Sequence, residues 1–562
     1  MKTYLAWQSY KKETPNRGYW DMQMIEDVFS RQMWSPVNAN EFEHVNSIQD
    51  IPRTADGAVV VLPARHHAHE QWTDKLNDDC TRFKWVIFML VGDEESAFPA
   101  WRLKHPNKRI WLMMARDQQD MHKMVDTRML NGYPTQLRQF AGKHRDLEIE
   151  KPLDWFFSGQ ITHPRREVFA EYAQAIADDK SRLVKTAGFT QGIEHGDYYT
   201  SMASAKVIPC PAGAQAPDSF RFCEALEFGC IPLADNRSSN LGFPPGYWNY
   251  VFRDDKLPFP IIEDWRAFPA LLVDILENWK PLANKVGAWW LNYKRDFTYQ
   301  LENDINALRG SVPEATNLKD KITVIVSSSP IPSHPSPWMI KETIASIRAH
   351  LPESEIIIMQ DGIRQEQQEW SKRYEDYKQA VLELCRNEWH NVLPVFFDEF
   401  LHQAEMTRRT LDRIKTPHLL FVEHDTPLCE DQPIEWDGIV CVLESGWAES
   451  VRLHHLDVGY IHPEHWDLMI DKERQDVCGI KVMRTNQYSQ RAHIATVDFY
   501  RRMMATFTEN SRTFIEDRVY TLFYEGKSPF KLAIYTPEGH IKRSRDLNGR
   551  EGGPKFDDRL VY

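Results

Sequence analysis

Two apolar runs, Lys206–Pro211 and Cys230–Ala234, enclose the residues with the clearest potential for chemistry. Each run is typical of a buried strand, and the segment Phe220–Phe228 between them has the pattern of a helix. Arg221 and Glu224 share a face in its first turns, where free backbone N–H groups and the helix dipole favour an anion. An arginine can hold a diphosphate through two hydrogen bonds, and a carboxylate can accept hydrogen bonds from ribose hydroxyls. The pattern therefore indicates a site for a nucleoside diphosphate sugar, and the alternative is an exposed ion pair between the two side chains.

The residues around this pair strengthen the first interpretation. Asp218 and Ser219 precede the helix and offer N-cap side chains. The run SFRFCEALEFGCIPL resembles the signature Ser-x-Arg-x-x-Glu-Ala-x-x-x-Gly-Cys-Ile-Pro of exostosin-like glycosyltransferases. The resemblance implies an α/β chain with a GT-B fold, which consists of two Rossmann-like domains. It also implies that Ser219, Arg221 and Glu224 bind the donor.

Residues 1–150 are predicted to form the first, acceptor-side Rossmann-like domain. Strand-like and helical segments alternate there, which predicts a parallel sheet wrapped by helices. Ligands of such sheets lie beyond the C-terminal ends of the strands, where two polar loops are expected. Candidates for a general base in these loops are His66, His67, Asp93 and Glu94, unless they are solvated loop residues or helix caps.

Residues 151–310 are predicted to form the second, donor-binding Rossmann-like domain. The strand Asp154–Gln160, the turn after it and a helix that runs to Ile176 resemble the start of that domain in the same family. Arg165 or Arg166 in the turn could therefore reach the donor phosphates.

A new α/β unit is predicted over residues 321–562. A strand at Ile322–Val326, a helix at Trp338–His350 and a strand ending in Asp361-Gly362 resemble the opening of a GT-A glycosyltransferase. Such a domain is a single Rossmann-like unit with a mixed sheet. The resemblance implies that Asp361 contacts the nucleotide base, and the alternative is a plain Asp-Gly turn.

Acidic residues that follow an apolar strand at His418–Val422 indicate a metal site. The run Glu423-His424-Asp425 resembles the Asp-x-Asp motif of GT-A enzymes, with Glu in place of the first Asp. A hard cation that bridges two phosphates needs carboxylate oxygens, and alternation in an extended strand would point Glu423 and Asp425 the same way. The ion expected is Mn²⁺ or Mg²⁺, with His540 as a late ligand.

A Glu-Asp pair near the end of the chain resembles the acceptor-side acids of inverting GT-A enzymes. A carboxylate there would take the proton of the acceptor hydroxyl. Asp517 is predicted to be this base and Glu516 to hold the acceptor or to act as the alternative base; the other possibility is a helix cap paired with Arg518. The basic, glycine-rich tail from Lys542 is predicted to be a lid over phosphates or a disordered end.

Composition excludes several other classes. The chain has 562 residues and a formal net charge of −13, which argues against a generally basic nucleic-acid binder. It has no apolar run of the ~18 residues that span a bilayer and no secretory leader, so we expect a soluble, cytoplasmic protein. Its 8 cysteines are expected to be reduced, and no zinc spacing is present.

Together these patterns predict a bifunctional glycosyltransferase whose order of modules resembles that of animal exostosins. Both halves would use nucleotide sugars, the GT-B half without a metal and the GT-A half with one. The acceptor would be a glycan or a similar molecule. Two alternatives are a viral enzyme that glycosylates hydroxymethylated bases of DNA, and a chain in which one half is a non-catalytic binding module. A nucleotide-sugar dehydrogenase or epimerase is disfavoured because no Gly-x-Gly-x-x-Gly opens either half.

Overall fold

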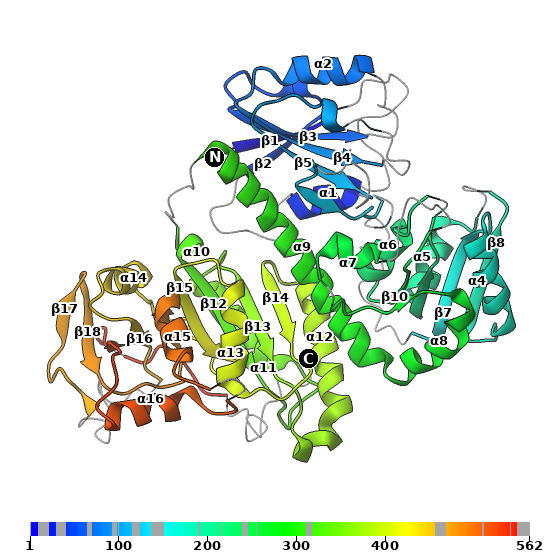
Figure 1. Cartoon of the computed structure of the whole chain (residues 1–562). Coiled ribbons are helices and arrows are strands. Elements are labelled where there is room, and N and C mark those ends of the chain that lie inside the picture. The colour runs from blue at the N-terminus through cyan, green and yellow to red at the C-terminus, as the bar shows by residue number, and fades with distance from the viewer. Residues whose placement is uncertain are drawn as a thin grey trace. The chain divides into compact units, whose positions relative to one another are not determined.

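The protein divides into two compact units, which are described separately. The computed structural model (Figure 1) describes residues 2–8, 22–29, 41–63, 70–92, 98, 100–114, 124–134, 137, 151–188, 192–213, 215–238, 246–254, 256–310, 317–455, 468–508, 511–539 and 541–547. The first unit ends at Pro313 and the second begins at Glu314.

The first unit opens with a six-stranded parallel sheet of order β2-β1-β3-β4-β5-β6. Its central strands β3 and β4 are buried throughout, as expected for a parallel sheet covered on both faces. Side chains of α2 pack on one face and those of α1 on the other. The elements are β1 (Lys2–Trp7), α1 (Met22–Phe29), β2 (Glu41–Val45), β3 (Gly57–Pro63), α2 (Glu70–Cys80), β4 (Trp85–Val91), β5 (Lys108–Met113) and β6 (Thr127–Met129).

A second parallel sheet follows in the same unit, with the order β11-β10-β9-β7-β8. Its first strand, β7, has β8 on one side and β9 on the other, so the order of the strands reverses at β7. In open α/β sheets ligands bind at such a switch point, beyond the carboxyl ends of the strands. The elements are β7 (Leu153–Gln160), α4 (Pro164–Ala175), β8 (Ser181–Thr186), α5 (His195–Ala203), β9 (Ala205–Cys210), α6 (Phe220–Glu227), β10 (Ile231–Asp235), α7 (Tyr247–Phe252), β11 (Ile261–Ile262) and α8 (Phe268–Glu277).

A long helix, α9 (Trp279–Arg309), links this second sheet back to the first. Trp111 of β5 donates a hydrogen bond from Nε1 to Asp304 Oδ2 at 2.8 Å. Arg309 pairs with Asp56 at 2.9 Å beside the start of β3. One continuous helix therefore contacts both sheets of the first unit.

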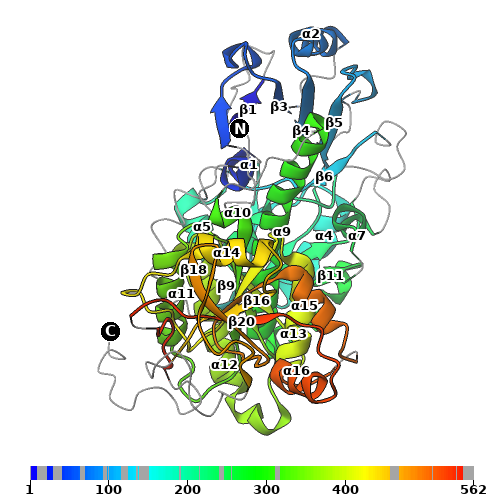
Figure 2. The same ribbon diagram turned by 90° about the vertical axis from the view of Figure 1, so that its left-hand side faces the viewer.

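The second unit contains one mixed sheet of order β14-β13-β12-β15-β19-β16-β20-β18-β17. The strands from β14 to β15 are parallel, and β19 joins β15 in the antiparallel direction. Helices α13, α15 and α16 lie together (Figure 2). Their buried side chains belong to one hydrophobic core. The strands are β12 (Ile322–Ser328), β13 (Ile356–Gln360), β14 (Val392–Phe396), β15 (His418–Glu423), β16 (Ser450–Arg452), β17 (Gln475–Val477), β18 (Ile480–Thr485), β19 (His493–Thr496) and β20 (Leu532–Tyr535). The helices are α10 (Leu318–Lys321), α11 (Trp338–His350), α12 (Ser371–Asn387), α13 (His402–Thr410), α14 (Trp436–Glu444), α15 (Val497–Met504) and α16 (Ile515–Tyr524).

The fold class expected from the sequence is confirmed, and one expectation about the cysteines is wrong. The chain is α/β, with two parallel Rossmann-like sheets followed by a mixed sheet. Cys441 of α14 and Cys478 form a disulfide, so the cysteines are not all reduced. The pairing was missed because 37 residues separate the two. No helix in the described part of the chain is long and apolar enough to cross a membrane.

Candidate functional site

Two arginines, the buried Arg221 and the half-buried Arg166, lie together at the carboxyl ends of β7 and β9. Arg221, in the first turn of α6, donates from Nη2 to the carbonyl of Ser158 at 2.8 Å, with its guanidinium over the ring of Phe157. Arg166, in the first turn of α4, donates to the carbonyls of Gln160 and Ala212 at 3.1 and 3.0 Å. Burial and the neighbouring charge of Arg221 lower the pKa of Arg166 to about 10. Neither arginine forms an ion pair with a carboxylate among the described residues.

Polar atoms without partners point to a ligand at the same place. Among the described residues, no group forms a hydrogen bond with Nε of Arg221 or Oγ of Ser219, although the two residues are only 5% and 7% exposed. Buried polar groups are nearly always hydrogen-bonded, so these two atoms indicate an anionic or polar ligand. Gly159 allows the guanidinium of Arg221 to lie close to the end of β7, because a Cβ on Gly159 would lie 2.8 Å from Nη2 of Arg221.

The N-terminal residues of α6 are used differently from the expectation. Ser219 is the N-cap residue, but its side chain makes no capping hydrogen bond. The carboxylate of Asp218 instead accepts a hydrogen bond from the backbone N–H of Asn131 at 2.8 Å. The capping predicted for these two side chains is therefore wrong, and the hydroxyl of Ser219 stays available to a ligand.

Arg165 points to a different partner from Arg166. It pairs with Asp235 at the end of β10 through its Nε and Nη2 atoms. Asp235 is fully buried and also accepts hydrogen bonds from the Trp265 indole at 2.8 Å and from the backbone of Ala212 at 3.1 Å. Arg165 is thus engaged in an internal ion pair, and its predicted contact with donor phosphates would require that pair to open.

Glu224 is held by two tyrosine hydroxyls. Tyr198 donates to Oε2 at 2.8 Å and Tyr199 to Oε1 at 3.4 Å. The carboxyl group is 1% exposed, and burial raises its pKa to about 7 against those hydrogen bonds and the charge of Arg221. No ion pair joins Glu224 to Arg221, so the alternative of an exposed surface pair does not hold. Each carboxylate oxygen accepts one of these hydrogen bonds and keeps a second acceptor position, so the predicted contact with ribose stays a prediction.

The raised pKa of Glu224 leads to a testable pH dependence. The folded state binds the proton more tightly than the unfolded state, whose ordinary value is 4.5. The stability of the first unit should therefore fall as the pH rises from that value to about 7, by roughly 1.4 kcal/mol per unit of pKa difference. Glu224→Gln should abolish this fall in urea unfolding measured across the range. The exposed Glu171→Gln is the matched control, and an unchanged fall in Glu224→Gln would contradict the assignment.

In the second unit, β15 ends at Glu423 and a turn follows. Thr426 closes the turn, since Glu423 donates its backbone N–H to Oγ1 of Thr426 at 3.1 Å and accepts from the N–H of Thr426 at 3.0 Å. Asp425 lies in this turn and not in an extended strand, so the alternation argument for its direction was wrong. Both carboxylates are half-exposed at the carboxyl end of a central strand.

Asp361 is buried and engaged by backbone groups. It accepts from the N–H groups of Gly362, Leu401 and His402 at 2.9, 2.7 and 3.0 Å, which places it at the N-terminus of α13. Burial raises the pKa of this carboxyl group, and the three hydrogen bonds oppose the rise. The structure therefore gives Asp361 a helix-capping role at the end of β13, and its predicted contact with the nucleotide base stays a prediction.

The two acids predicted on the acceptor side differ in environment. Glu516 is half-buried, and burial raises its pKa against the charges of Arg452 and Arg491. Asp517 is exposed one residue further along α16. Glu516 and Glu423 each lie within electrostatic reach of the side chain of Tyr488.

Several predicted residues lie outside the described part of the chain. They are His540 and the base candidates His66, His67, Asp93 and Glu94. Within the described part, no group of three or more metal-binding side chains is found.

The described part of the tail is ordered beside the acidic turn. Leu547 donates its backbone N–H to the carbonyl of Asp425 at 2.8 Å, and Arg545 donates to Pro427 at 2.8 Å. The segment that ends at Leu547 is therefore hydrogen-bonded to the turn that contains Asp425. Neither of the two predictions for the tail, a lid or a disordered end, included this contact.

Comparisons with known proteins add a limited structural likeness. No family model matches the chain, and no curated protein matches it. Residues 1–349 of S. aureus TarS in complex with UDP-GlcNAc match with 13% identity over 40% of this chain and 58% of that chain, at a TM-score of 0.27. The mannosyltransferase PcManGT from Pyrobaculum calidifontis, in complex with GDP-Man and Mn²⁺, matches with 12% identity over 40% of this chain and 56% of that chain, at 0.25. The chain spans less than two thirds of the length of either. At these scores the fold class rests on the chain's own sheet orders.

Proposed function

We propose that this protein is a glycosyltransferase that uses nucleotide-sugar donors and has one donor site in each unit. The observation that carries the proposal is the pair of neighbouring arginines, the buried Arg221 and the half-buried Arg166, at the switch point of the second sheet. Arg166 and Arg221 lie within electrostatic reach of each other, and among the described residues their hydrogen bonds go only to carbonyl oxygens. Two adjacent positive charges that form no ion pair with a described carboxylate favour an anion with at least two charges, such as a diphosphate.

The first donor site would work without a metal. Breaking the bond between the sugar and the diphosphate leaves negative charge on the phosphate oxygens, and fixed donors in a buried site stabilise that charge most effectively. Nε of Arg221 and Oγ of Ser219 supply two donors that no described residue uses. Glu224 holds Tyr198 and Tyr199 in place one turn further along α6 and so shapes the wall of the site.

The second donor site would take a divalent cation, Mn²⁺ or Mg²⁺. Asp425 and Glu423 fit such an ion, because it binds through one or two carboxylates and completes its shell with substrate phosphates and water. When bound, the ion would neutralise charge on the donor's diphosphate. Of the two acids on α16, the half-buried Glu516 has the environment of a general base, while the exposed Asp517 has that of a residue that contacts the acceptor.

The proposed acceptor is a glycan, because the described residues hold no observation that favours hydroxymethylated DNA. The alternative in which one half is a non-catalytic binding module is tested by measuring the two sites separately.

Titration of the whole protein with UDP, GDP, ADP and CDP tests the proposal. With Mn²⁺ present, at least one of them is expected to bind at two sites, and EDTA should abolish one site and leave the other. A single class of site that EDTA removes completely would overturn the metal-free site. Failure of all four nucleotides to bind under either condition would overturn the proposal as a whole.

A further inference from the structure

The last described residues of the chain, Ile541–Leu547, are mostly buried in the second unit. This tail segment pairs with two parts of the chain that are far apart in the sequence. Ser544 forms an antiparallel bridge with Leu428, which follows the acidic turn. Lys542 forms a parallel bridge with His454, which follows β16. The tail segment therefore lies between the residues that follow the acidic turn and those that follow β16.

Backbone hydrogen bonds join the tail segment to the acidic turn. Leu547 donates its N–H to the carbonyl of Asp425 at 2.8 Å, and Arg545 donates to the carbonyl of Pro427 at 2.8 Å. The carbonyl and the side chain of Asp425 share one Cα atom, so a shift of this carbonyl also moves the carboxylate. A metal ligand has to be held within roughly 0.5 Å of its productive position. The hydrogen bond from Leu547 therefore restricts where the predicted metal ligand can lie.

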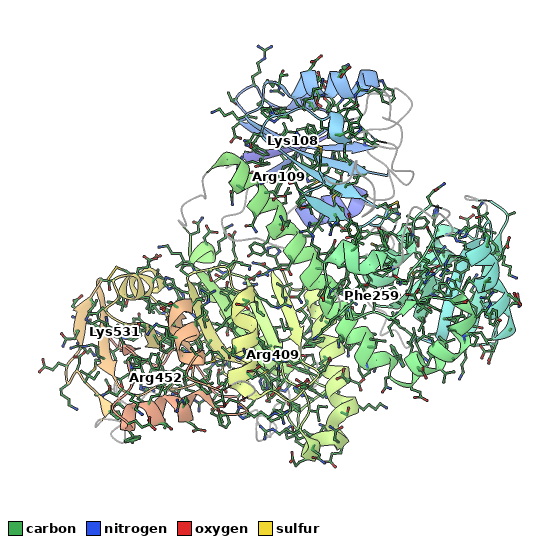
Figure 3. All side chains as sticks on the ribbon, viewed as in Figure 1. Lys108, Arg109, Phe259, Arg409, Arg452 and Lys531 are labelled. Carbon is green, nitrogen blue, oxygen red and sulfur yellow. A yellow bond between two sulfur atoms is a disulfide. The ribbon has the colours of Figure 1, made fainter. Side chains whose placement is uncertain are left out.

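The residue before Leu547 contacts the predicted acceptor side. Asp546 pairs with Arg491 at 2.7 Å. Burial raises the pKa of Glu516, and the charges of Arg452 and Arg491 oppose the rise, so both arginines lie close to this acid. Arg452 is the last residue of β16 and lies beside α16, which carries Glu516 (Figure 3). Two consecutive residues of the tail segment thus contact the loop beside Glu516 and the acidic turn.

Side chains also attach the tail segment to α11 and to the loop before it. Arg545 pairs with Glu342 of α11 at 3.0 Å. Leu547 packs with Ile331 and Met339 in a small hydrophobic core. Because the tail segment is fixed by these other contacts, it can restrict the acidic turn instead of moving with it.

We propose that Asp546 and Leu547 are positioning residues that hold the acidic turn at a fixed distance from the loop beside Glu516, and that the second unit binds its divalent cation and nucleotide tightly only while the tail segment is in place. The inference rests on the proposed function for the cation at Asp425. Leu547 acts through the carbonyl of Asp425, and Asp546 acts through Arg491. Cation binding and docking of the tail segment are therefore coupled, and each favours the other.

The competing explanation is that the tail segment only adds stability to the second unit. In that case its loss would lower the free energy of unfolding, but the affinity of the folded protein for the cation would stay the same. The two explanations differ in a binding constant, which is measured well below the temperature of unfolding.

Hydrogen exchange of the full-length wild-type protein tests the coupling. The ligands are Mn²⁺ and whichever of UDP, GDP, ADP and CDP binds most tightly with it, each at about a hundred times its Kd. We expect exchange in residues 541–547 to slow by roughly tenfold or more, because ligands at such an excess disfavour an opening that disrupts their site. EDTA should remove the effect. Exchange of β17 and β18, at the far edge of the same sheet, is the control and should not change.

Substitutions separate the hydrogen bond from the packing of the tail segment. Leu547→Pro removes the N–H that bonds to Asp425, whereas Leu547→Ala keeps it and shortens the side chain. With nucleotide present, Leu547→Pro should weaken Mn²⁺ binding by roughly tenfold, as is typical of residues that orient metal ligands, and Leu547→Ala should weaken it by a smaller factor. Asp546→Asn and Arg491→Gln break the same ion pair. The double variant should therefore lose no more Mn²⁺ affinity than the weaker-binding single variant.

Each result either supports or overturns the inference. Unchanged exchange of residues 541–547 on ligand binding would overturn it, and this measurement does not depend on the folding of any variant. Wild-type affinity for Mn²⁺ in a folded Leu547→Pro protein would overturn it in favour of the competing explanation. The EDTA-resistant nucleotide site should keep its affinity in every variant. A wild-type protein that binds no nucleotide in a Mn²⁺-dependent manner would overturn the proposed second donor site, and this inference with it.

Discussion

Arg221→Gln is expected to weaken nucleoside diphosphate binding in the first unit by roughly a hundredfold, which is typical for truncation of one partner of a buried charge pair. No described residue accepts a hydrogen bond from Nε of the guanidinium, which lies beside Arg166, so glutamine would remove both a donor and a charge from the anion site. Titration with EDTA present isolates this effect, because the metal-dependent site is then silent.

Two further variants make this result specific. Gly159→Ala would place a methyl group 2.8 Å from Nη2 of Arg221 and should weaken binding by a smaller factor, because the flexible guanidinium can move away from the Ser158 carbonyl. Arg237→Gln removes an arginine that pairs with Glu263 in an exposed position at the end of the same sheet, and it should bind normally. Wild-type affinity in Arg221→Gln would refute the first donor site.

Asp425→Asn is expected to abolish the EDTA-sensitive nucleotide site and leave the EDTA-resistant site unchanged. Loss of one of two carboxylate ligands should lower the affinity for Mn²⁺ by roughly a hundredfold or more, since even changes to residues that only orient metal ligands cost ten- to a hundredfold. The direct measurement is a Mn²⁺ titration in the presence of a saturating nucleotide, followed by electron paramagnetic resonance of the free ion.

Neighbouring residues supply the comparison for this second prediction. Glu423→Gln should have a similar effect if both carboxylates bind the ion, and a much smaller one if Asp425 binds it alone. Asp431→Asn changes an exposed carboxylate six residues further along and should leave Mn²⁺ binding intact. An Asp425→Asn protein that keeps EDTA-sensitive binding would place the metal elsewhere.

The strands with continuous apolar runs could be predicted from the sequence, because burial on both faces leaves an unambiguous pattern. The runs over β3, β4 and β12 are of this kind, and α11 was predicted with its exact bounds, Trp338–His350. The strand β2 was missed because its residues Glu41–Val45 are exposed or half-buried at a sheet edge and alternate weakly.

The candidate site could be predicted only where the chemistry lies in side chains that are close in the sequence. Arg221 was identified from its position in the helix. Its hydrogen-bond partner is the backbone carbonyl of Ser158, and this could not be predicted because every residue has a backbone carbonyl. Arg165 was expected to meet phosphate, whereas its partner Asp235 lies 70 residues away. Long-range pairing of this kind depends on the order of the strands, which periodicity does not show.

At Asp425 a side chain competes with the neighbouring strands for backbone hydrogen bonds, and the apolar pattern of the strand does not show this. The hydroxyl of Thr426 offers the backbone of Glu423 a hydrogen bond that ends the strand. The prediction placed both acids in an extended chain, whereas Asp425 lies in the turn that follows the strand.

The helix α9 has a consequence for how the first unit folds. Its residues Val286, Trp290 and Phe297 belong to a single hydrophobic core that also contains Val59 of the first sheet and Phe222 of the second. A boundary near residue 150 therefore separates two sheets that share this core, while each sheet also has a core of its own on its other face. The two sheets are thermodynamically coupled through one helix, so the N-terminal sheet depends for part of its apolar contacts on residues that the ribosome adds more than a hundred positions later. The first unit is thus expected to complete its folding only after α9 has been synthesised.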